Sequence, residues 1–350
     1  MAVGLDIGTS AVRAAELSVS RGSITLQKFG QVALPPGAVS DGEVIDHRLV
    51  AEALRQLWSQ VKFSSKNVAL GVANQKVVVR QVDLPGMDES ELRRALALQV
   101  QDFIPIPVEQ AILDFHTIEH FVNENGGPML RVLLVAAARE TVSSALEAVQ
   151  AAGLKPVSVD LTSFAVIRAL AQVDEVGMET RAQALVDIGA RVTNIAVHQG
   201  GVPKFVRMLL MGGHDITDAV AERMGIPVDQ AEAVKHSSGI PGSPAERDAT
   251  PAARAIEQGS TAFVEEIRGS LDYYLASPGA VPIDRIVVSG GGSRLGNILQ
   301  RISTATRLPA ELAAPLSNLK VGKTGLSDDQ LQYIQPLVAV PVGLAMGVAS

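Results

Sequence analysis

The sequence predicts an α/β fold of two related halves around a cleft, with a smaller α+β subdomain inserted between them. The main observation is a repeat, in which Leu5-Asp6-Ile7-Gly8 returns as Val186-Asp187-Ile188-Gly189. Each copy lies inside a run that reads strand, glycine turn, strand. Residues 83–157, between the copies, follow a different pattern. The cleft would receive one carboxylate and one glycine turn from each half, which suits a metal-bound polyphosphate.

The composition limits the classes of protein to which the chain can belong. Its 350 residues allow more than one domain, and 47% hydrophobic residues can bury a large core. The net charge of −7 and the 3% aromatic content argue against a nucleic-acid-binding surface. The absence of cysteine argues against thiolate metal sites and a thiol nucleophile. The six histidines lack metal-binding spacing.

The first half reads as a strand meander that leads into a helix. Hydrophobic periodicity predicts strands at 2–6, 11–19, 23–33, 67–73 and 76–82, and a helix at 46–61. Arg21-Gly22 supplies a hairpin turn between the second and third strands. The second half repeats the plan with Gly200-Gly201 at its hairpin and strands at 183–188, 192–198 and 202–210.

The inserted segment opens with the turn Asp83-Leu84-Pro85-Gly86. Asp88, with Glu91 three residues later, predicts the start of a helix. That helix is expected to end at Phe103-Ile104-Pro105-Ile106-Pro107, because proline lacks an amide hydrogen and restricts the preceding residue. Strands at 111–119 and 129–137 and a helix at 139–152 complete the segment.

The rest of the second half is expected to hold a loop at 237–253, a helix at 254–276, a strand at 286–289 and a helix at 294–304. Residues 337–350 carry no charge and predict a packed terminal helix. Their apolar run is shorter than the ~20 residues that span a membrane, and no signal peptide is recognised. We therefore expect a cytoplasmic protein.

The turn after the first strand carries groups that suit phosphate. Gly8 permits a tight turn, and backbone amides with the hydroxyls of Thr9 and Ser10 can surround phosphate oxygens. Arg13, on the following strand, can add a positive charge. An ordinary polar hairpin is the alternative, and the second copy of the motif favours phosphate binding.

The second turn has fewer polar groups than the first. Ala190 and Arg191 stand where the first turn has hydroxyls, which leaves Thr193 and Asn194, beside Gly189, as candidate ligand-binding residues. This turn therefore offers a ligand fewer hydroxyl groups than the first.

Asp6 and Asp187 each end a strand that is predicted to be buried. A buried carboxylate without a partner is costly. A shared, hydrated Mg²⁺ would relieve that cost, since this ion keeps several waters and takes one or two carboxylates. Two aspartates that merely cap turns are the alternative.

A glycine triplet forms the third candidate element. The apolar strand Ile286–Ser289 enters Gly290, Gly291 and Gly292, which are followed by Ser293. The bare backbone lets a ligand approach closely, near a helix N-terminus. The dinucleotide fingerprint is absent, because Leu295 stands at its last glycine position. A simple tight turn is the alternative.

Three motifs in this order resemble the actin-like ATPase superfamily, which includes actin, Hsp70, sugar kinases and FtsA. Asp6–Arg13 is similar to its first phosphate motif, Asp187–Asn194 to its second, and Ile286–Ser293 to its adenosine motif. Within the superfamily the chain resembles the PilM family of type IV pilus assembly proteins. The segments that carry this resemblance are Leu84-Pro85-Gly86-Met87, Phe103-Ile104-Pro105-Ile106-Pro107 and Ile112-Leu113-Asp114-Phe115.

The resemblance implies an actin-like ATPase fold with an inserted subdomain called 1C. The segments it implies are 1–82 (first part of subdomain 1A), 83–157 (1C), 158–182 (return to 1A), 183–213 (first part of 2A), 214–283 (2B), 284–336 (second part of 2A) and 337–350 (terminal helix on 1A).

The resemblance also assigns roles to single residues. Gly213 belongs to a glycine pair that begins a helix, and Glu232 and Lys235 are similar to the pair that reaches the sugar and base of ATP. A solvated i, i+3 ion pair is the alternative for these two. Asp160, in the connecting segment, is the weak candidate for orienting the attacking water.

The function implied is a cytoplasmic scaffold of type IV pilus assembly that binds ATP and Mg²⁺, with weak or regulatory ATPase activity. The implied partner is the N-terminal segment of a PilN-like inner-membrane protein, in a groove between 1A and 1C. Contacts with other pilus assembly proteins and self-association are further expectations. An FtsA-like division protein and a sugar-kinase-type phosphotransferase are the alternatives. The chain end lacks the basic amphipathic helix expected of the former, and the sequence offers no convincingly placed catalytic carboxylate for the latter.

Overall fold

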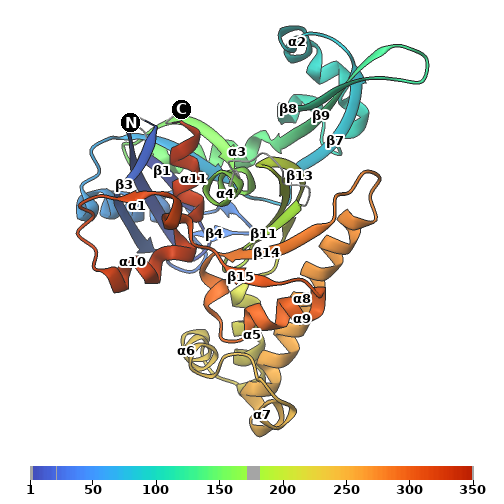
Figure 1. Ribbon diagram of the computed structural model, residues 1–350. Coiled ribbons are helices and arrows are strands. Elements are labelled where there is room, and N and C mark those ends of the chain that lie inside the picture. Colours follow the sequence, from blue (N-terminus) through green and yellow to red (C-terminus); the bar gives the residue numbers. More distant parts are fainter. Residues whose placement is uncertain (1–2, 21, 172–181, 349–350) are drawn as a thin grey trace.

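A computed structural model describes residues 3–20, 22–171 and 182–348, so Arg21 of the predicted hairpin, the segment 172–181 and the chain ends lie outside the described residues. Two large sheets form the body, and a third, smaller sheet projects from it (Figure 1). The strand orders are β10-β6-β1-β2-β3-β16 in the first sheet, β13-β12-β11-β14-β15 in the second and β7-β9-β8 in the projecting sheet.

The first half contains the six-stranded sheet and the helices that cover it. Its elements are β1 (Val3–Ile7), β2 (Ala11–Ser20), β3 (Ser23–Ala33), β4 (Val39–Ser40), β5 (Glu43–Val44), α1 (His47–Val61), β6 (Asn67–Val72), α3 (Arg139–Ala151), β10 (Lys155–Leu161) and α4 (Thr162–Leu170). Helix α1 begins where the Asp46 carboxylate accepts a hydrogen bond from the Leu49 amide. It ends at Lys62, whose positive φ of 57° cannot continue a helix.

The second half contains the five-stranded sheet. Its elements are β11 (Ala182–Ile188), β12 (Thr193–Gln199), β13 (Val202–Leu209), α5 (Gly213–Met224), α6 (Val228–Ser238), α7 (Pro244–Ala249), α8 (Pro251–Leu275), β14 (Ile283–Ser289), η3 (Gly291–Arg294), α9 (Ile298–Thr306) and β15 (Ala310–Leu312).

The two halves share one topology, which confirms the predicted duplication. Strand β1 pairs with β2 in antiparallel and with β6 in parallel, and β11 pairs in the same two ways with β12 and β14. Asp6 faces Arg13 across the first hairpin, and Asp187 faces Asn194 across the second. The repeated tetrapeptides therefore occupy equivalent positions at the carboxyl ends of central strands.

The projecting insert is smaller than the sequence predicts. Its elements are β7 (Val77–Pro85), α2 (Glu89–Gln99), η1 (Gln101–Phe103), η2 (Val108–Gln110), β8 (Ala111–Val122) and β9 (Pro128–Ala138). The Asp88 cap is confirmed by its bond from the Glu91 amide. Helix α2 ends at Gln99, earlier than expected, because the backbone of Val100, at φ −111° and ψ 3°, leaves helical geometry.

Two expected boundaries differ from the structure. Helix α3, expected in the insert, packs with α1 in the first-half core, and β10 pairs with β6. Residues 315–336, expected in the second half, return to the first, where β16 pairs with β3, and they lead into the terminal helix that was expected there. The chain from residue 315 onward comprises η4 (Pro315–Asn318), β16 (Lys320–Val321), α10 (Asp328–Ile334), η5 (Gln335–Leu337) and α11 (Ala339–Gly347).

Two predictions of local structure were wrong. The expected loop at 237–253 contains α7, and α8 begins at Pro251, because Ser243 and Thr250 cap helices whose first residue is proline. The expected helix at 294–304 begins only at Ile298, since Asn297 has a positive φ of 67°. The glycine triplet therefore enters a short 3₁₀ turn instead of a long helix.

Helix α11 packs backbone to backbone against the first half. A Cβ on Gly4 of β1 would lie 1.9 Å from the Pro341 carbonyl oxygen, and one on Gly343 would lie 1.8 Å from that of Ala165 in α4. Only glycine allows these approaches. The uncharged C-terminal helix is therefore part of the core next to β1.

Candidate functional site

A cavity of about 450 Å³ lies at the carboxyl ends of the central strands, between the two halves. Most of the residues predicted from the sequence line it together. They are Asp6, Gly8, Thr9, Ser10, Arg13, Asp187, Gly189, Asn194, Gly213, Glu232, Lys235, Gly290, Gly291 and Gly292. The volume is within the range of small-molecule and cofactor sites.

The two glycine turns have the same internal hydrogen bond. The Gly8 amide donates to the Ala11 carbonyl at 3.0 Å, and the Gly189 amide donates to the Val192 carbonyl at 3.0 Å. A Cβ on Gly189 would lie 2.5 Å from the Val192 oxygen, so this turn requires glycine. The repeat in sequence is therefore a repeat in backbone geometry.

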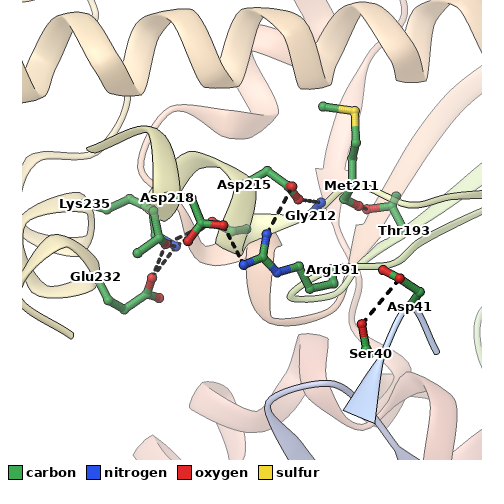
Figure 2. Close-up of polar contacts among 12 residues, drawn as sticks. Ser40, Asp41, Arg191, Thr193, Met211, Gly212, Asp215, Asp218, Glu232 and Lys235 are labelled. Carbon is green, nitrogen blue, oxygen red and sulfur yellow. Dashed lines mark hydrogen bonds and ion pairs between the residues drawn. The ribbon is translucent and has the colours of Figure 1, made fainter. Parts of the chain in front are cut away.

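The second turn is already engaged by the start of α5. The Gly213 amide donates to the Gly189 carbonyl at 3.0 Å, and the His214 amide to the Ala190 carbonyl at 2.8 Å. Figure 2 shows Arg191 reaching Asp215 at 3.3 Å and Asp218 at 2.5 Å. This side chain is thus committed to α5, whereas Thr9 and Ser10 of the first turn line the cavity.

The two strand-end carboxylates lie in the cavity wall, where Asp187 is buried and Asp6 is partly exposed. Arg13 Nη1 lies 3.3 Å from Asp6 Oδ2. Burial raises the pKa of Asp6, and the Arg13 guanidinium opposes that rise. Burial also raises the pKa of Asp187, to about 6, against the hydrogen bond that Ser289 Oγ donates to its Oδ1 at 2.7 Å. The charge of Asp6 raises the pKa of Asp187 further.

These carboxylates fit a hydrated Mg²⁺. They are close enough for the charge of one to disfavour ionisation of the other, which a divalent cation would reverse. The Asn194 side-chain oxygen, opposite Asp187 on β12, is buried with no hydrogen-bond partner in the described chain. Within the described ranges no cluster of three or more His, Cys, Asp or Glu could hold a metal. Two carboxylates plus water suit Mg²⁺ better than a fully protein-bound ion.

The pocket glycines fall into two groups. A Cβ on Gly290 or Gly292 would lie 2.4 or 2.3 Å from atoms of Ile188, so protein packing alone requires glycine there. At Gly213 and Gly291 the nearest atoms would lie 3.6 and 3.9 Å away, which is ordinary contact. Packing leaves room for a side chain at these two positions, where a Cβ would occupy cavity space. Their bare backbone fits a ligand that lies against it.

Glu232 and Lys235 form an ion pair that lines the cavity, and the interpretation as a solvated pair fails for Lys235, because its side chain is buried while Glu232 is partly exposed. Lys235 is 4% exposed. Its Nζ donates to the Gly213 carbonyl at 2.9 Å, to Thr217 Oγ1 at 2.7 Å and to Glu232 Oε2 at 2.7 Å. Both residues lie on α6, and Lys235 reaches across to α5 (Figure 2). Burial acts to raise the pKa of Glu232, but the hydrogen bonds from Lys235 and Thr217 leave it below its ordinary value.

Three predicted residues do not line the cavity. Thr193 is fully buried, and its hydroxyl donates to the Met211 carbonyl at 2.7 Å (Figure 2), because alternation along β12 turns Asn194 toward the cavity instead. Ser293 Oγ donates to the Gly290 carbonyl at 2.7 Å and closes the 3₁₀ turn. Asp160, the candidate water orienter, is hydrogen-bonded by Arg168.

Several cavity residues escaped sequence reasoning. Thr141 lies in the first turn of α3 after β9, and Thr162 begins α4 directly after β10, so the rule that ligands bind at strand ends could have indicated both. Arg294 follows the glycine triplet and could have been found with it. Tyr333 lies on α10 and has no sequence signal.

A family profile described as "Type IV pilus assembly protein PilM" matches residues 4–348. The chain belongs to this family. A solved structure described as the "PilM-PilN type IV pilus biogenesis complex" is similar to this PilM-family chain, with 27% identity and a TM-score of 0.86. The similarity covers 100% of this chain and 98% of that one.

More distant relatives are consistent with an actin-like fold. The cell division protein FtsA of Neisseria meningitidis serogroup B (strain ATCC BAA-335 / MC58) is 24% identical over 89% of this chain and 83% of its own length. FtsA of Bacillus subtilis (strain 168) is 24% identical over 68% of this chain, which spans only 58% of that protein. The structure of MreB5 of Spiroplasma citri bound to ADP, at 14% identity, covers 99% of this chain and 95% of its own with a TM-score of 0.54. It shares the fold.

Among the described residues, no helix is both long enough and apolar enough to cross a membrane.

Proposed function

We propose that this PilM-family chain is a cytoplasmic, ATP-binding scaffold of type IV pilus assembly. The observation that carries the proposal is the pair of equivalent turns that bring Asp6 and Asp187 into one cavity. The first turn offers backbone amides and two hydroxyls to phosphate oxygens. Gly213 and Gly291 leave bare backbone for the rest of the nucleotide.

Mg²⁺ would be held by Asp6 and Asp187 with water, and would neutralise phosphate charge when bound. Asn194 orients the Asp187 side of this site, because its amide hydrogen-bonds that carboxylate. Ser289 holds the same carboxylate from β14. The second half therefore presents a fixed carboxylate to the cation.

Slow hydrolysis follows from how the polar groups are engaged. The carboxylates among the described residues that line the cavity are Asp6, Asp187 and Glu232. Two of them belong to the proposed cation site, and Glu232 is bound by Lys235 and Thr217. None is free to orient an attacking water. Nucleotide would then act mainly through binding, by favouring one placement of the two halves over another.

A second cavity, of about 300 Å³, fits a peptide partner. It lies between the insert, α4 and the β12–β13 hairpin. Its lining is mainly apolar and aromatic, with a few polar groups: Asp114, Phe115, His116, Val135, Phe164, Ile167, Arg168, Gly201 and Pro203. A structural relative is described as a complex with PilN. We propose that the N-terminal segment of a PilN-like inner-membrane protein binds here and holds the scaffold at the membrane.

The outer part of the insert supports contacts with further proteins. Leu98 on α2 is 77% exposed and Val122 at the end of β8 is 67% exposed. Large apolar side chains in solvent favour association. Other pilus assembly proteins and a second copy of the chain are the proposed occupants, and sedimentation velocity with and without Mg·ATP measures the latter.

The central experiment is calorimetric titration of the protein with a PilN-type N-terminal peptide, with and without Mg·ATP. The scaffold proposal expects saturable peptide binding whose affinity changes with nucleotide. His116→Trp should weaken the peptide by filling the cavity, whereas His120→Trp, exposed on the same strand but outside it, should not. Absence of ATP binding in the parent protein, or equal peptide affinity in both variants, contradicts the proposal.

A further inference from the structure

One wall of the nucleotide cavity is built from both halves of the fold. The guanidinium carbon of Arg294 lies 3.6 Å from the centre of the Tyr333 ring, and both residues line the cavity. Arg294 is the last residue of η3, two positions after the glycine triplet of the second half. Tyr333 lies on α10, in the segment that β16 joins to the first-half sheet. The contact therefore crosses from one half to the other.

The segment that carries Tyr333 is held against the glycine triplet. The Gly290 amide donates to the Pro336 carbonyl at 2.8 Å. Ile334, the neighbour of Tyr333, is buried at 6% exposure, whereas Tyr333 itself is 51% exposed. The backbone is thus held directly after Tyr333, and the half-exposed Tyr333 side chain stands at the cavity with the Arg294 guanidinium over its ring.

A guanidinium between two flat partners is a favourable arrangement. The cation is planar, and each of its faces can stack on a π-system. Here the Tyr333 ring occupies one face. A nucleobase has a π-face of its own, and bases stack on arginine in this way. The geometry leaves the opposite face of Arg294 for such a base.

We propose that Tyr333 is a positioning residue for the nucleotide base, and that it acts by holding the Arg294 guanidinium flat at the cavity so that the base stacks on its other face. This inference rests on the proposed nucleotide function and deepens it. Tyr333 belongs to the segment joined to the first half, and Arg294 belongs to the second half. The affinity for a base stacked on Arg294 therefore depends on how the first half is placed relative to the second. The larger π-face of a purine favours ATP over a pyrimidine triphosphate.

The test separates base contacts from phosphate contacts. Affinities for Mg·ATP and for magnesium tripolyphosphate, which has no base, are measured for the parent protein, Tyr333→Leu and Tyr333→Phe. Tyr273→Leu is the matched control, since Tyr273 is 65% exposed on α8 and does not line the cavity. Tyr333→Leu should bind ATP about threefold to tenfold more weakly, the size of one stacked cationic contact. Its tripolyphosphate affinity should match the parent, and Tyr333→Phe should restore ATP affinity.

The outcomes distinguish this inference from the proposed function. A parent protein that binds neither ligand overturns both. A parent that binds ATP while Tyr333→Leu retains its full affinity overturns only the role of Tyr333. Tighter ATP binding by Tyr333→Leu would show that the ring blocks the base site, which also overturns it. Equal weakening of ATP and tripolyphosphate would assign Tyr333 a general structural role instead.

Discussion

Replacing Asp187 by asparagine should stabilise the protein in the absence of metal and nucleotide. The Asp187 carboxylate is 8% exposed, and its pKa is raised from 3.8 to about 6, chiefly by burial. The folded protein therefore holds a proton that the unfolded chain releases. The free energy of unfolding that this bound proton contributes is fully present below pH 4 and is lost as the pH rises through 6. Above pH 7 the ionised carboxylate costs about 3 kcal/mol, taking about 1.4 kcal/mol per tenfold change in proton affinity.

Asparagine removes this cost and keeps most contacts. Its side-chain oxygen can still accept from Ser289 Oγ. If the Asn194 side-chain amide turns over, its oxygen, which is buried without a partner among the described residues, can accept from the new amide. We expect Asp187→Asn and parent to have similar free energies of unfolding at pH 4, and the variant to gain up to about 3 kcal/mol by pH 8.

Urea unfolding followed by circular dichroism, in EDTA at several pH values, measures the difference. Asp102→Asn, at an exposed aspartate of the insert, is the control and should show no such trend. Adding Mg·ATP should stabilise the parent at pH 8 but not Asp187→Asn. A variant less stable than the parent at pH 8 in EDTA would refute the view that this buried charge is costly without a cation.

Three further predictions concern packing, ligand contact and helix capping. Gly292→Ala should cost about 1–3 kcal/mol of stability, because the added Cβ would clash with Ile188. Gly291→Ala should unfold like the parent but bind Mg·ATP about tenfold more weakly. Equal stability of the two variants in urea titration would contradict the division of these glycines into packing and ligand-contact positions. Lys235→Met should lower the free energy of unfolding by about 1–3 kcal/mol, because Glu232 and Thr217 lose the hydrogen bonds that Lys235 donates to them. Thermal unfolding measures this loss. Asp46→Ala should cost about 1 kcal/mol through the lost α1 cap, with unchanged Mg·ATP affinity.

The repeated tetrapeptides allowed the fold class to be predicted from the sequence. A glycine two residues after an aspartate at the end of an apolar strand is typical of a tight turn, and its appearance in both halves predicted the duplicated sheets and the shared cavity. Helix caps were equally local, and Asp88 acted as expected. The wrong helix start near Asn297 and the missed helix after Ser243 had local causes too. Asn297 has a positive φ, and the helix after Ser243 begins with proline, and the hydrophobic pattern predicts neither.

The parts that escaped prediction depend on contacts between distant segments. Thr193 and Asn194 differ by one position, and only the register of β12 decides which faces the cavity. Lys235 is buried because α6 packs on the start of α5, which a spacing of three residues cannot reveal. Tyr333 reaches the cavity only because β16 returns to β3. Sequence motifs predicted the glycine turns and carboxylates at the strand ends, and the remaining cavity residues depend on tertiary packing.

Helix α4 extends from one cavity to the other. Thr162, at its beginning, lines the cavity between the halves, and Ile167 and Arg168, about 8 Å further along the helix axis, line the cavity beside the insert. If nucleotide and peptide occupy the two cavities as proposed, α4 is in contact with both. Thermodynamic linkage then requires that any factor by which nucleotide changes the peptide dissociation constant is the factor by which peptide changes that of nucleotide. A membrane-bound partner would thereby set how tightly the scaffold binds its nucleotide.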